Sequence, residues 1–309
     1  MNSIHDMIKR LETILLGKPD VIEMAMTCLL AGGHLLLEDL PGVGKTTLAA
    51  ALARLVQGKF NRVQFTADLL PSDIIGTRIY RRRDDTFEFI RGPIFSHFLL
   101  ADELNRAPPK TQSALLQAMN ERAVSVDCET IPLPEPFMVI ATQNPRGYHG
   151  TYPLPESQRD RFLMRLSIGF PDLDTEMRIL AGHREKEPVD SLQSVLTPEE
   201  TVAMQAKIKG VRVPEPVAAY ISRLAEATRA HPDVLVPVSP RGSIALMKAT
   251  QALAFIRDRE FIDIDLVKYL APAVLGHRMS LRIASQIAGG EGAPVSWVDR
   301  ELLQCVPVE

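Results

Sequence analysis

One stretch of the sequence has the residue types, in the right order, to grip phosphate groups. Pro41-Gly42-Val43-Gly44-Lys45-Thr46-Thr47 follows the apolar run His34 to Glu38 and leads into a helical pattern. Glycines let backbone N–H groups turn toward phosphate oxygens, a helix N-terminus adds the positive end of its dipole, and the lysine reaches the outer phosphates. The hydroxyl of Thr46 is placed to bind Mg²⁺. We therefore predict a site for ATP and Mg²⁺ over residues 41 to 47.

This loop departs from the usual pattern at one position. Such a loop normally begins with a glycine five residues before Gly44, and this chain has Asp39 there. Pro41 and Gly42 keep the sharp turn. The substitution therefore bears on loop detail and affinity rather than on nucleotide binding itself.

Two carboxylates, Asp102 and Glu103, end a second apolar run, Phe98 to Ala101. Ligands of open α/β sheets bind at the carboxyl ends of the strands, so we expect this pair beside the loop. Asp102 would then orient Mg²⁺ through its water shell, and Glu103 would position or deprotonate the attacking water. Alone, such a pair is equally typical of a helix start. The phosphate-binding loop favours the catalytic interpretation.

The elements that position these residues can be inferred from hydrophobic patterning. Short apolar runs alternating with helical patterns predict a parallel sheet covered by helices. The five predicted strands are His34 to Glu38, Arg62 to Phe65, Phe98 to Ala101, Phe137 to Ala141 and Phe162 to Ile168. Between the second and third, residues 77 to 90 predict an inserted β-hairpin whose turn, Arg81 to Asp85, is interpreted as a solvated tip. Residues 124 to 136 are a second candidate insertion.

After Phe170 the strand signals stop and helical patterns follow. The predicted helices are Leu173 to Lys186, Pro198 to Lys209, Pro214 to Arg229, Pro240 to Arg257 and Asp263 to Arg278. We therefore predict two domains: an α/β domain with a five-stranded parallel sheet over residues 1–170, and a small all-helical lid over residues 171–309.

Composition narrows the classes of function. The net charge of −3 provides no global positive field, so nucleic acid is not an expected partner. No apolar stretch approaches the roughly 18 residues of a membrane span, and the first residues do not resemble a signal peptide. Three widely spaced cysteines suit a reducing compartment. We expect a cytoplasmic protein, and the seven histidines show no metal-ligand spacing.

Together the motifs resemble the MoxR family of AAA+ ATPases over nearly the whole chain. The resemblance rests on Pro41 to Thr47, Asp102 to Ala107, Ala141 to Pro145, Asp160 to Phe162 and Ser239 to Arg241. It implies a sheet with the phosphate-binding strand in the centre, an insertion matching the hairpin at 77 to 90, and a helical lid.

Family membership implies further site residues. Asn144 matches the sensor 1 position, where a neutral amide hydrogen-bonds the γ-phosphate or the water; a turn-forming Asn-Pro pair is the alternative. Arg161 resembles the arginine finger that one subunit offers to its neighbour's ATP, with Arg159 as a competitor and a surface ion pair with Asp160 as the alternative. Arg241 resembles sensor 2, which couples lid position to the nucleotide.

The resemblance also implies an adenine contact and a function. Leu16 and Gly17, within Leu15 to Pro19, look like the adenine-contacting stretch, although they could form a simple turn between helices. The family implies a homo-oligomeric ring, a hexamer, that remodels protein substrates with a partner carrying a von Willebrand factor A domain. Two other functions stay open: the ATPase subunit of a metal chelatase, and a nucleotide-dependent assembly that acts in transcription or DNA transactions.

Overall fold

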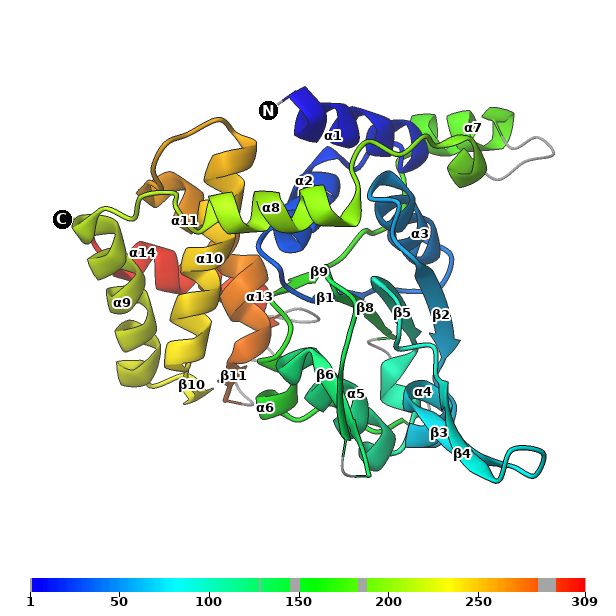
Figure 1. The fold of residues 1–309 in the computed structure, drawn as a ribbon. Coiled ribbons are helices and arrows are strands. Elements are labelled where there is room, and N and C mark those ends of the chain that lie inside the picture. The colour runs from blue at the N-terminus through cyan, green and yellow to red at the C-terminus, as the bar shows by residue number, and fades with distance from the viewer. Residues whose placement is uncertain (1, 128, 145–150, 183–187, 283–292, 309) are drawn as a thin grey trace.

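The computed structural model describes residues 2–127, 129–144, 151–182, 188–282 and 293–308. It contains a sheet with helices on both faces and, beside it, a group of helices from the C-terminal half (Figure 1). The strands are β1 (Leu35–Glu38), β2 (Phe60–Gln64), β3 (Gly76–Arg81), β4 (Thr86–Arg91), β5 (Phe98–Asp102), β6 (Ala123–Val126), β7 (Glu129–Pro132), β8 (Met138–Gln143), β9 (Met164–Leu166), β10 (Val234–Val236) and β11 (Ser280–Leu281).

Helices connect and cover these strands. The α-helices are α1 (Asn2–Ile14), α2 (Pro19–Leu30), α3 (Lys45–Leu55), α4 (Pro71–Ile75), α5 (Pro109–Glu121), α6 (Glu156–Arg159), α7 (Leu173–Gly182), α8 (Pro198–Ile208), α9 (Glu215–Ala230), α10 (Pro240–Ile256), α11 (Ile264–Leu275), α13 (Ala293–Trp297) and α14 (Leu303–Cys305). Short turns of 3₁₀-helix lie at Leu104–Arg106, Pro188–Ser191 and Gly276–Arg278, and a π-helical turn at Val298–Leu302.

The main sheet is parallel and has five strands in the order β2-β5-β8-β1-β9. The five predicted strands are thus confirmed, although β9 is shorter than the predicted run from Phe162 to Ile168. One detail of the prediction is wrong. The phosphate-binding strand β1 is an interior strand, but the middle strand is β8, so β1 lies one place from the centre.

Alternation along the strands explains how the sheet is buried on both faces. Leu35 and Leu37 belong to a core shared with the N-terminal helices, whereas Leu36 belongs to a second core on the other face. Successive side chains of a strand point to opposite faces, so a continuous apolar run is needed where helices cover both. This is why the strands read as unbroken apolar segments.

Both candidate insertions are antiparallel hairpins. β3 and β4 pair from Gly76 with Arg91 to Arg81 with Thr86, which confirms the predicted hairpin. β6 and β7 form the second. The two are joined by an ion pair, with Arg78 Nη2 at 2.7 Å from Glu129 Oε2. The hairpin of β3 and β4 projects from the body of the protein (Figure 1).

The C-terminal half is mostly helical, and its helices begin where the sequence places capping residues. Thr197 caps α8: its side chain accepts a hydrogen bond from the Glu200 amide at 3.2 Å, and the Glu200 carboxylate accepts one from the Thr197 amide at 2.8 Å. The prediction of an all-helical lid was wrong in one respect, because β10 and β11 form a two-stranded antiparallel ladder. These strands are too short for a periodic signal. The predicted helix at 173 to 186 ends at Gly182, and residues 183–187 lie outside those described.

The lid packs against the N-terminal helices as well as against the sheet. One core continues from α1 and α2 into the faces of α10 and α11. At the C-terminal end of α10, Arg257 donates two hydrogen bonds to Glu23 of α2, at 2.9 and 2.7 Å. The lid is therefore joined to α2 by a shared core and, at the end of α10, by this ion pair. The division at residue 170 stays a prediction.

Candidate functional site

The phosphate-binding loop leaves β1 and turns into α3 through two glycines in the left-handed region. Gly42 has a φ of 86° and Gly44 a φ of 98°. Side chains other than glycine rarely adopt these angles. Gly44 is the residue immediately before α3, so the loop ends on the amide groups of a helix N-terminus, a site that favours anions.

Lys45 lies folded back onto its own loop. Its ammonium group donates to the carbonyl oxygens of Asp39 at 2.7 Å and Leu40 at 3.2 Å. Burial lowers the pKa of Lys45 below its ordinary value, while the nearby carboxylates of Asp39, Asp102 and Glu103 act in the opposite direction. The acid pair is therefore close enough to Lys45 to interact with it, as the predicted arrangement requires.

Asp39, the unusual residue of the loop, makes hydrogen bonds with a second segment of the chain. Its buried carboxylate accepts hydrogen bonds from the Ser167 hydroxyl at 2.7 Å and from the amides of Ile168 at 2.6 Å and Gly169 at 3.1 Å. These residues follow β9, the neighbour of β1. Asp39 therefore ties the start of the phosphate-binding loop to the chain that leads into the lid, a link that glycine cannot make.

Replacing Asp39 with alanine should lower the free energy of unfolding by about 1–3 kcal/mol, because the buried amide of Ile168 would lose its acceptor. Urea denaturation of the purified protein measures this change. Asp84→Ala, at the exposed tip of the β3–β4 hairpin, is the matched control and should leave the midpoint unchanged. Equal midpoints for Asp39→Ala and the wild type would contradict the assigned link.

Asp102 ends β5 and is fixed by two neighbouring strands. Its carboxylate accepts hydrogen bonds from the Thr142 hydroxyl of β8 at 2.7 Å and from Arg62 of β2 at 2.6 Å. Sequence reasoning assigned no role to Thr142 or Arg62. Thr142 directly follows the predicted strand Phe137 to Ala141, so its place near a carboxyl end could be inferred from the sequence. Arg62 begins the predicted strand Arg62 to Phe65 and gave no such signal.

Glu103 sits in a backbone conformation that directs the chain away from the strand. Its φ of 56° and ψ of 47° place it in the left-handed region, which is uncommon for residues with a side chain and costs free energy. Its amide donates to the Thr142 hydroxyl at 2.8 Å, and its carboxylate accepts from Arg106 at 2.7 Å. Thr142 thus holds both members of the acid pair in place.

These groups surround one pocket of about 420 Å³. It is lined by Gly42, Gly44, Lys45, Thr46 and Thr47 of the loop, by both members of the acid pair, and by Asn144 after β8. The structure therefore brings together the predicted phosphate, metal, water and sensor 1 residues. The roles of the individual residues stay predictions.

Leu16 and Gly17 lie beside this pocket but do not line it. The segment approaches the loop through Leu15, because a Cβ atom placed on Gly44 would be 3.0 Å from its Cδ1. Gly17 has a φ of 72° and faces Thr175 of α7. The segment is therefore adjacent to the loop, and its predicted contact with adenine is not tested.

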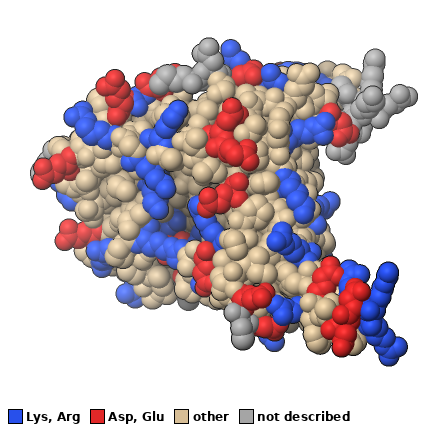
Figure 2. All heavy atoms as spheres, in the orientation of Figure 1, with Lys and Arg blue, Asp and Glu red and all other residues tan. Residues whose placement is uncertain are grey.

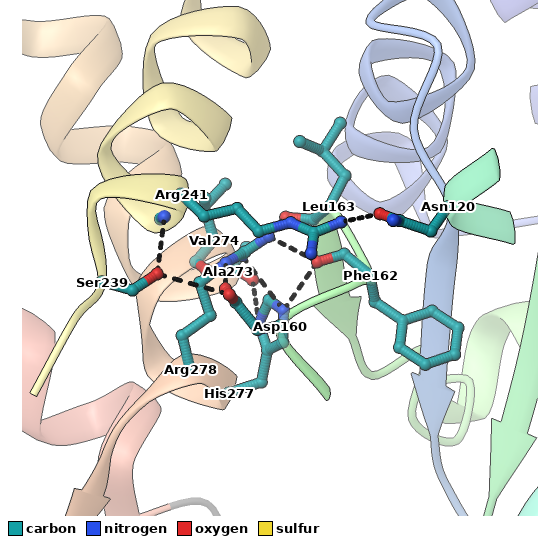
Figure 3. A network of polar contacts seen from close by, with 11 residues as sticks. Asn120, Asp160, Phe162, Leu163, Ser239, Arg241, Ala273, Val274, His277 and Arg278 are labelled. Carbon is teal, nitrogen blue, oxygen red and sulfur yellow. Dashed lines mark hydrogen bonds and ion pairs between the residues drawn. The ribbon is translucent and has the colours of Figure 1, made fainter. Parts of the chain in front are cut away.

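Arg161 and Arg241 line a second pocket, of about 230 Å³, and not the first. Arg161 donates to the Leu116 carbonyl at 2.5 Å, and Arg241 donates to the Asn120 side chain. Both acceptors belong to α5, and Figure 3 shows Arg241 beside Asn120. Arginines from two distant parts of the chain therefore rest on one helix.

Arg159, the competitor for the finger role, faces a different pocket. Its guanidinium lies 3.4 Å from Glu156, and it shares this third pocket with Arg165, which pairs with Glu38 at 2.7 Å. Arg159 and Arg161 therefore point into different surroundings, and only Arg161 shares a pocket with Arg241.

Fold and site together define the AAA class of ATPases. The model of the ATPase family associated with various cellular activities (AAA) matches residues 34–164, and that of the AAA lid domain matches residues 226–295. These ranges contain the loop, the acid pair and about half of the predicted lid. The chain is therefore a nucleotide-binding ATPase with a helical lid.

Within that class, the chain belongs to the MoxR family. It is 39% identical to Chaperone MoxR1 of Mycobacterium tuberculosis, over 91% of this chain and 76% of that protein. It is 31% identical to Protein MoxR of Methylorubrum extorquens, over 86% of this chain and 84% of that protein. A solved structure of a candidate ATPase from Cytophaga hutchinsonii is 35% identical, with a TM-score of 0.89, covering 100% of this chain and 95% of that one.

Two observations concern the length of the apolar helices and the distribution of charge on the surface. Among the described residues, no helix is both long and apolar enough to cross a membrane. On the face shown in Figure 2, acidic and basic side chains are intermixed rather than separated into large patches of one sign. Such a face gives no broad electrostatic footprint for a nucleic-acid backbone.

Proposed function

We propose that this chain hydrolyses ATP, with Mg²⁺, at sites shared between neighbouring copies in a hexameric ring, and uses the energy to remodel protein complexes. In this proposal one copy supplies the loop, the acid pair and Asn144. The next copy supplies Arg161 as the arginine finger and Arg241 as sensor 2. The observation that carries the proposal is the placement of these two arginines.

The two pockets lie at opposite ends of the same strand. The nucleotide pocket follows β1 at Pro41, whereas the arginine pocket includes Gly33 and His34, which precede it. Four residues of strand span roughly 13 Å at about 3.3 Å each, so Arg161 and Arg241 are held away from the ATP of their own chain. A contact in which one end of a subunit meets the other end of the next is head-to-tail, and such contacts form a ring when the rotation between subunits closes.

Within one chain, each residue of the nucleotide pocket has a task. The loop amides and Lys45 hold the phosphates, while Asn144 hydrogen-bonds the γ-phosphate or the attacking water. Glu103 orients that water and accepts its proton. Glu103 lines the pocket, and the hydrogen bond from its amide to Thr142 fixes its backbone there.

Mg²⁺ fits the donors that the pocket offers. Thr46 and Asp102 provide hard oxygen ligands, and the remaining ligands would come from phosphate and water. Among the described residues no cluster of three or more His, Cys, Asp or Glu could hold a metal on its own, so the ion would bind with the nucleotide. When bound, Mg²⁺ would neutralise charge on the transferred phosphoryl group.

The neighbouring arginines complete the site. Guanidinium is always charged and matches phosphate oxygens with paired donors, so Arg161 would stabilise charge on the γ-phosphoryl group. One of its terminal nitrogens donates to the Leu116 carbonyl, and the side chain lines the pocket that it shares with Arg241.

The remodelling function is supported by the relatives and by the projecting hairpin. One relative is named a chaperone, which favours this function over the chelatase and the DNA-acting assembly. On β3 and β4, Tyr80 is 50% exposed and Phe87 is 69% exposed, and their rings are 5.4 Å apart. Exposed aromatic residues on a projecting hairpin suit contact with protein substrates. A partner with a von Willebrand factor A domain stays part of the proposal.

Mixed rings test the shared site. Arg161→Ala and Lys45→Ala proteins should each be nearly inactive, and mixing them should restore roughly one quarter of wild-type ATP hydrolysis, because half the loops are intact and half of their neighbours carry Arg161. Steady-state phosphate release measures this, with light scattering to verify assembly. Arg82→Ala, at the exposed hairpin tip, is the control and should keep full activity. No restoration in rings that assemble would overturn the proposal.

A further inference from the structure

A third, buried arginine lines the same pocket as Arg161 and Arg241. Arg278, at the end of the turn Gly276–Arg278, has a side chain only 2% exposed and pairs with Asp160 at 2.9 Å. It also donates to the carbonyl oxygens of Phe162 at 2.5 Å and Leu163 at 3.0 Å, and to that of Val274 (Figure 3). One lid residue therefore binds three positions within a four-residue stretch of the other domain: 160, 162 and 163.

The gripped segment is the one that carries Arg161. Asp160 also accepts a hydrogen bond from the Ser239 hydroxyl at 3.3 Å. Ser239 caps α10, and Arg241 follows two residues later. The Asp160 carboxylate therefore bridges Arg278 and the start of the helix that bears Arg241.

Helix α5 provides a common support for the two active arginines. Leu116 accepts from Arg161 and Asn120 accepts from Arg241. These acceptors are four residues apart, about one helical turn or roughly 6 Å along the axis. The two guanidinium groups thus bind neighbouring acceptors on one helix. They can do so only if the backbones that carry Arg161 and Arg241 are held at the right positions relative to α5.

Close packing leaves Arg278 little freedom. A Cβ atom on Gly242, the residue after Arg241, would come within 3.1 Å of the Arg278 Cδ and 2.6 Å of Val238. Burial lowers the pKa of Arg278 to about 10, with Asp160 acting in the opposite direction, so the side chain is charged at neutral pH. The backbone of α10 at Gly242 therefore packs against the aliphatic part of the charged Arg278 side chain.

Holding the lid against the first domain does not by itself require a buried arginine. A buried ion pair adds little net stability compared with apolar packing of the same volume. What an arginine adds is direction, since its donors lie in one rigid plane and fix the groups that accept from it. Arg257, another arginine that joins the lid to the first domain, instead pairs with Glu23 of α2.

We propose that Arg278 is a positioning residue: through Asp160 and the carbonyls of residues 162 and 163 it sets Arg161 and Arg241 in register on α5, so that both act together on the neighbour's nucleotide. The inference rests on the proposed shared site. In this proposal, a movement of the lid would be transmitted to Arg161 through the turn Gly276–Arg278.

Arg278→Lys tests this role because lysine keeps the charge but loses the planar set of donors. We expect kcat for ATP hydrolysis to fall about tenfold to a hundredfold, as a displaced arginine pair would cause, and KM for ATP to stay within about twofold. The loop of the variant is intact, so mixing it with Lys45→Ala protein should restore activity. A defect confined to folding of the variant chain would not be restored in this way.

Arg257→Lys is the matched control, since it changes the same atoms at the other end of α10. It should leave kcat and KM unchanged. Asp160→Asn is the second variant, for the case in which Arg278→Lys does not fold, and it should show the same loss of kcat and the same restoration. Circular dichroism verifies folding of each protein.

The outcomes separate this inference from the proposed function. If Arg161→Ala is restored by Lys45→Ala protein but neither Arg278→Lys nor Asp160→Asn is, the shared site stands and the positioning role fails. If no mixture recovers activity, both fail. A wild-type kcat for folded Arg278→Lys, or for folded Asp160→Asn where the lysine variant does not fold, would also overturn the positioning role. Restoration of all the variants tested supports it.

Discussion

Lys45→Ala should weaken ATP binding by about a hundredfold to ten-thousandfold. Two charge-assisted hydrogen bonds to phosphate, each contributing about 1.5–3 kcal/mol, would be lost, and about 1.4 kcal/mol corresponds to a factor of ten in affinity. In the structure the ammonium group is held by the carbonyls of Asp39 and Leu40, so it is already at the loop. Nucleotide binding therefore requires an exchange of partners, not a long movement.

Isothermal titration calorimetry with ATP and Mg²⁺ measures this loss. Lys59→Ala is the matched control, because Lys59 is exposed and precedes β2 away from the loop. Its affinity should equal that of the wild type. Tight binding by Lys45→Ala would contradict the assignment of residues 41 to 47 as the phosphate site, and with it the basis of the whole mechanism.

Local signals explain why the nucleotide pocket could be predicted from sequence. The loop from Pro41 to Thr47 is a single contiguous motif, and the strand before it and the helix after it are short-range patterns. The acid pair needed only the rule that parallel strands share one carboxyl edge. Each inference used residues close in sequence or one general rule of topology.

The partner of Asp39 shows where such reasoning ends. The sequence marks Asp39 as unusual. The groups that donate hydrogen bonds to it, however, lie far along the chain, at residues 167 to 169 just after β9. Nothing local indicates which strand edge will supply those donors. The meaning of the departure therefore required the tertiary structure.

The pocket that Arg161 and Arg241 share could not be predicted from the sequence either, because its residues are far apart along the chain. Sequence resemblance marked Arg161 and Arg241 separately, and it gave no sign that they share one pocket on α5. Arg278 was not singled out at all, since a Gly-His-Arg turn at the end of a helix has no motif of its own. The strands β10 and β11 were missed because three residues and two residues carry no period.

Glu103→Gln should bind ATP normally and hydrolyse it about a hundredfold to ten-thousandfold more slowly, the range attributed to a positioned general base. Glutamine has nearly the same shape, and its amide oxygen can still accept from Arg106. It cannot accept the proton of the attacking water. The loss should therefore fall on kcat, with little change in KM.

Single-turnover phosphate release, together with calorimetry of ATP binding, separates these two effects. Glu121→Gln, an exposed change at the end of α5, is the matched control and should leave both quantities unchanged. Since the Thr142 hydroxyl holds the Glu103 backbone at 2.8 Å, Thr142→Val should show a milder form of the same kcat defect. Unchanged hydrolysis by Glu103→Gln would remove Glu103 from its role and leave Asn144 as the group that positions the water.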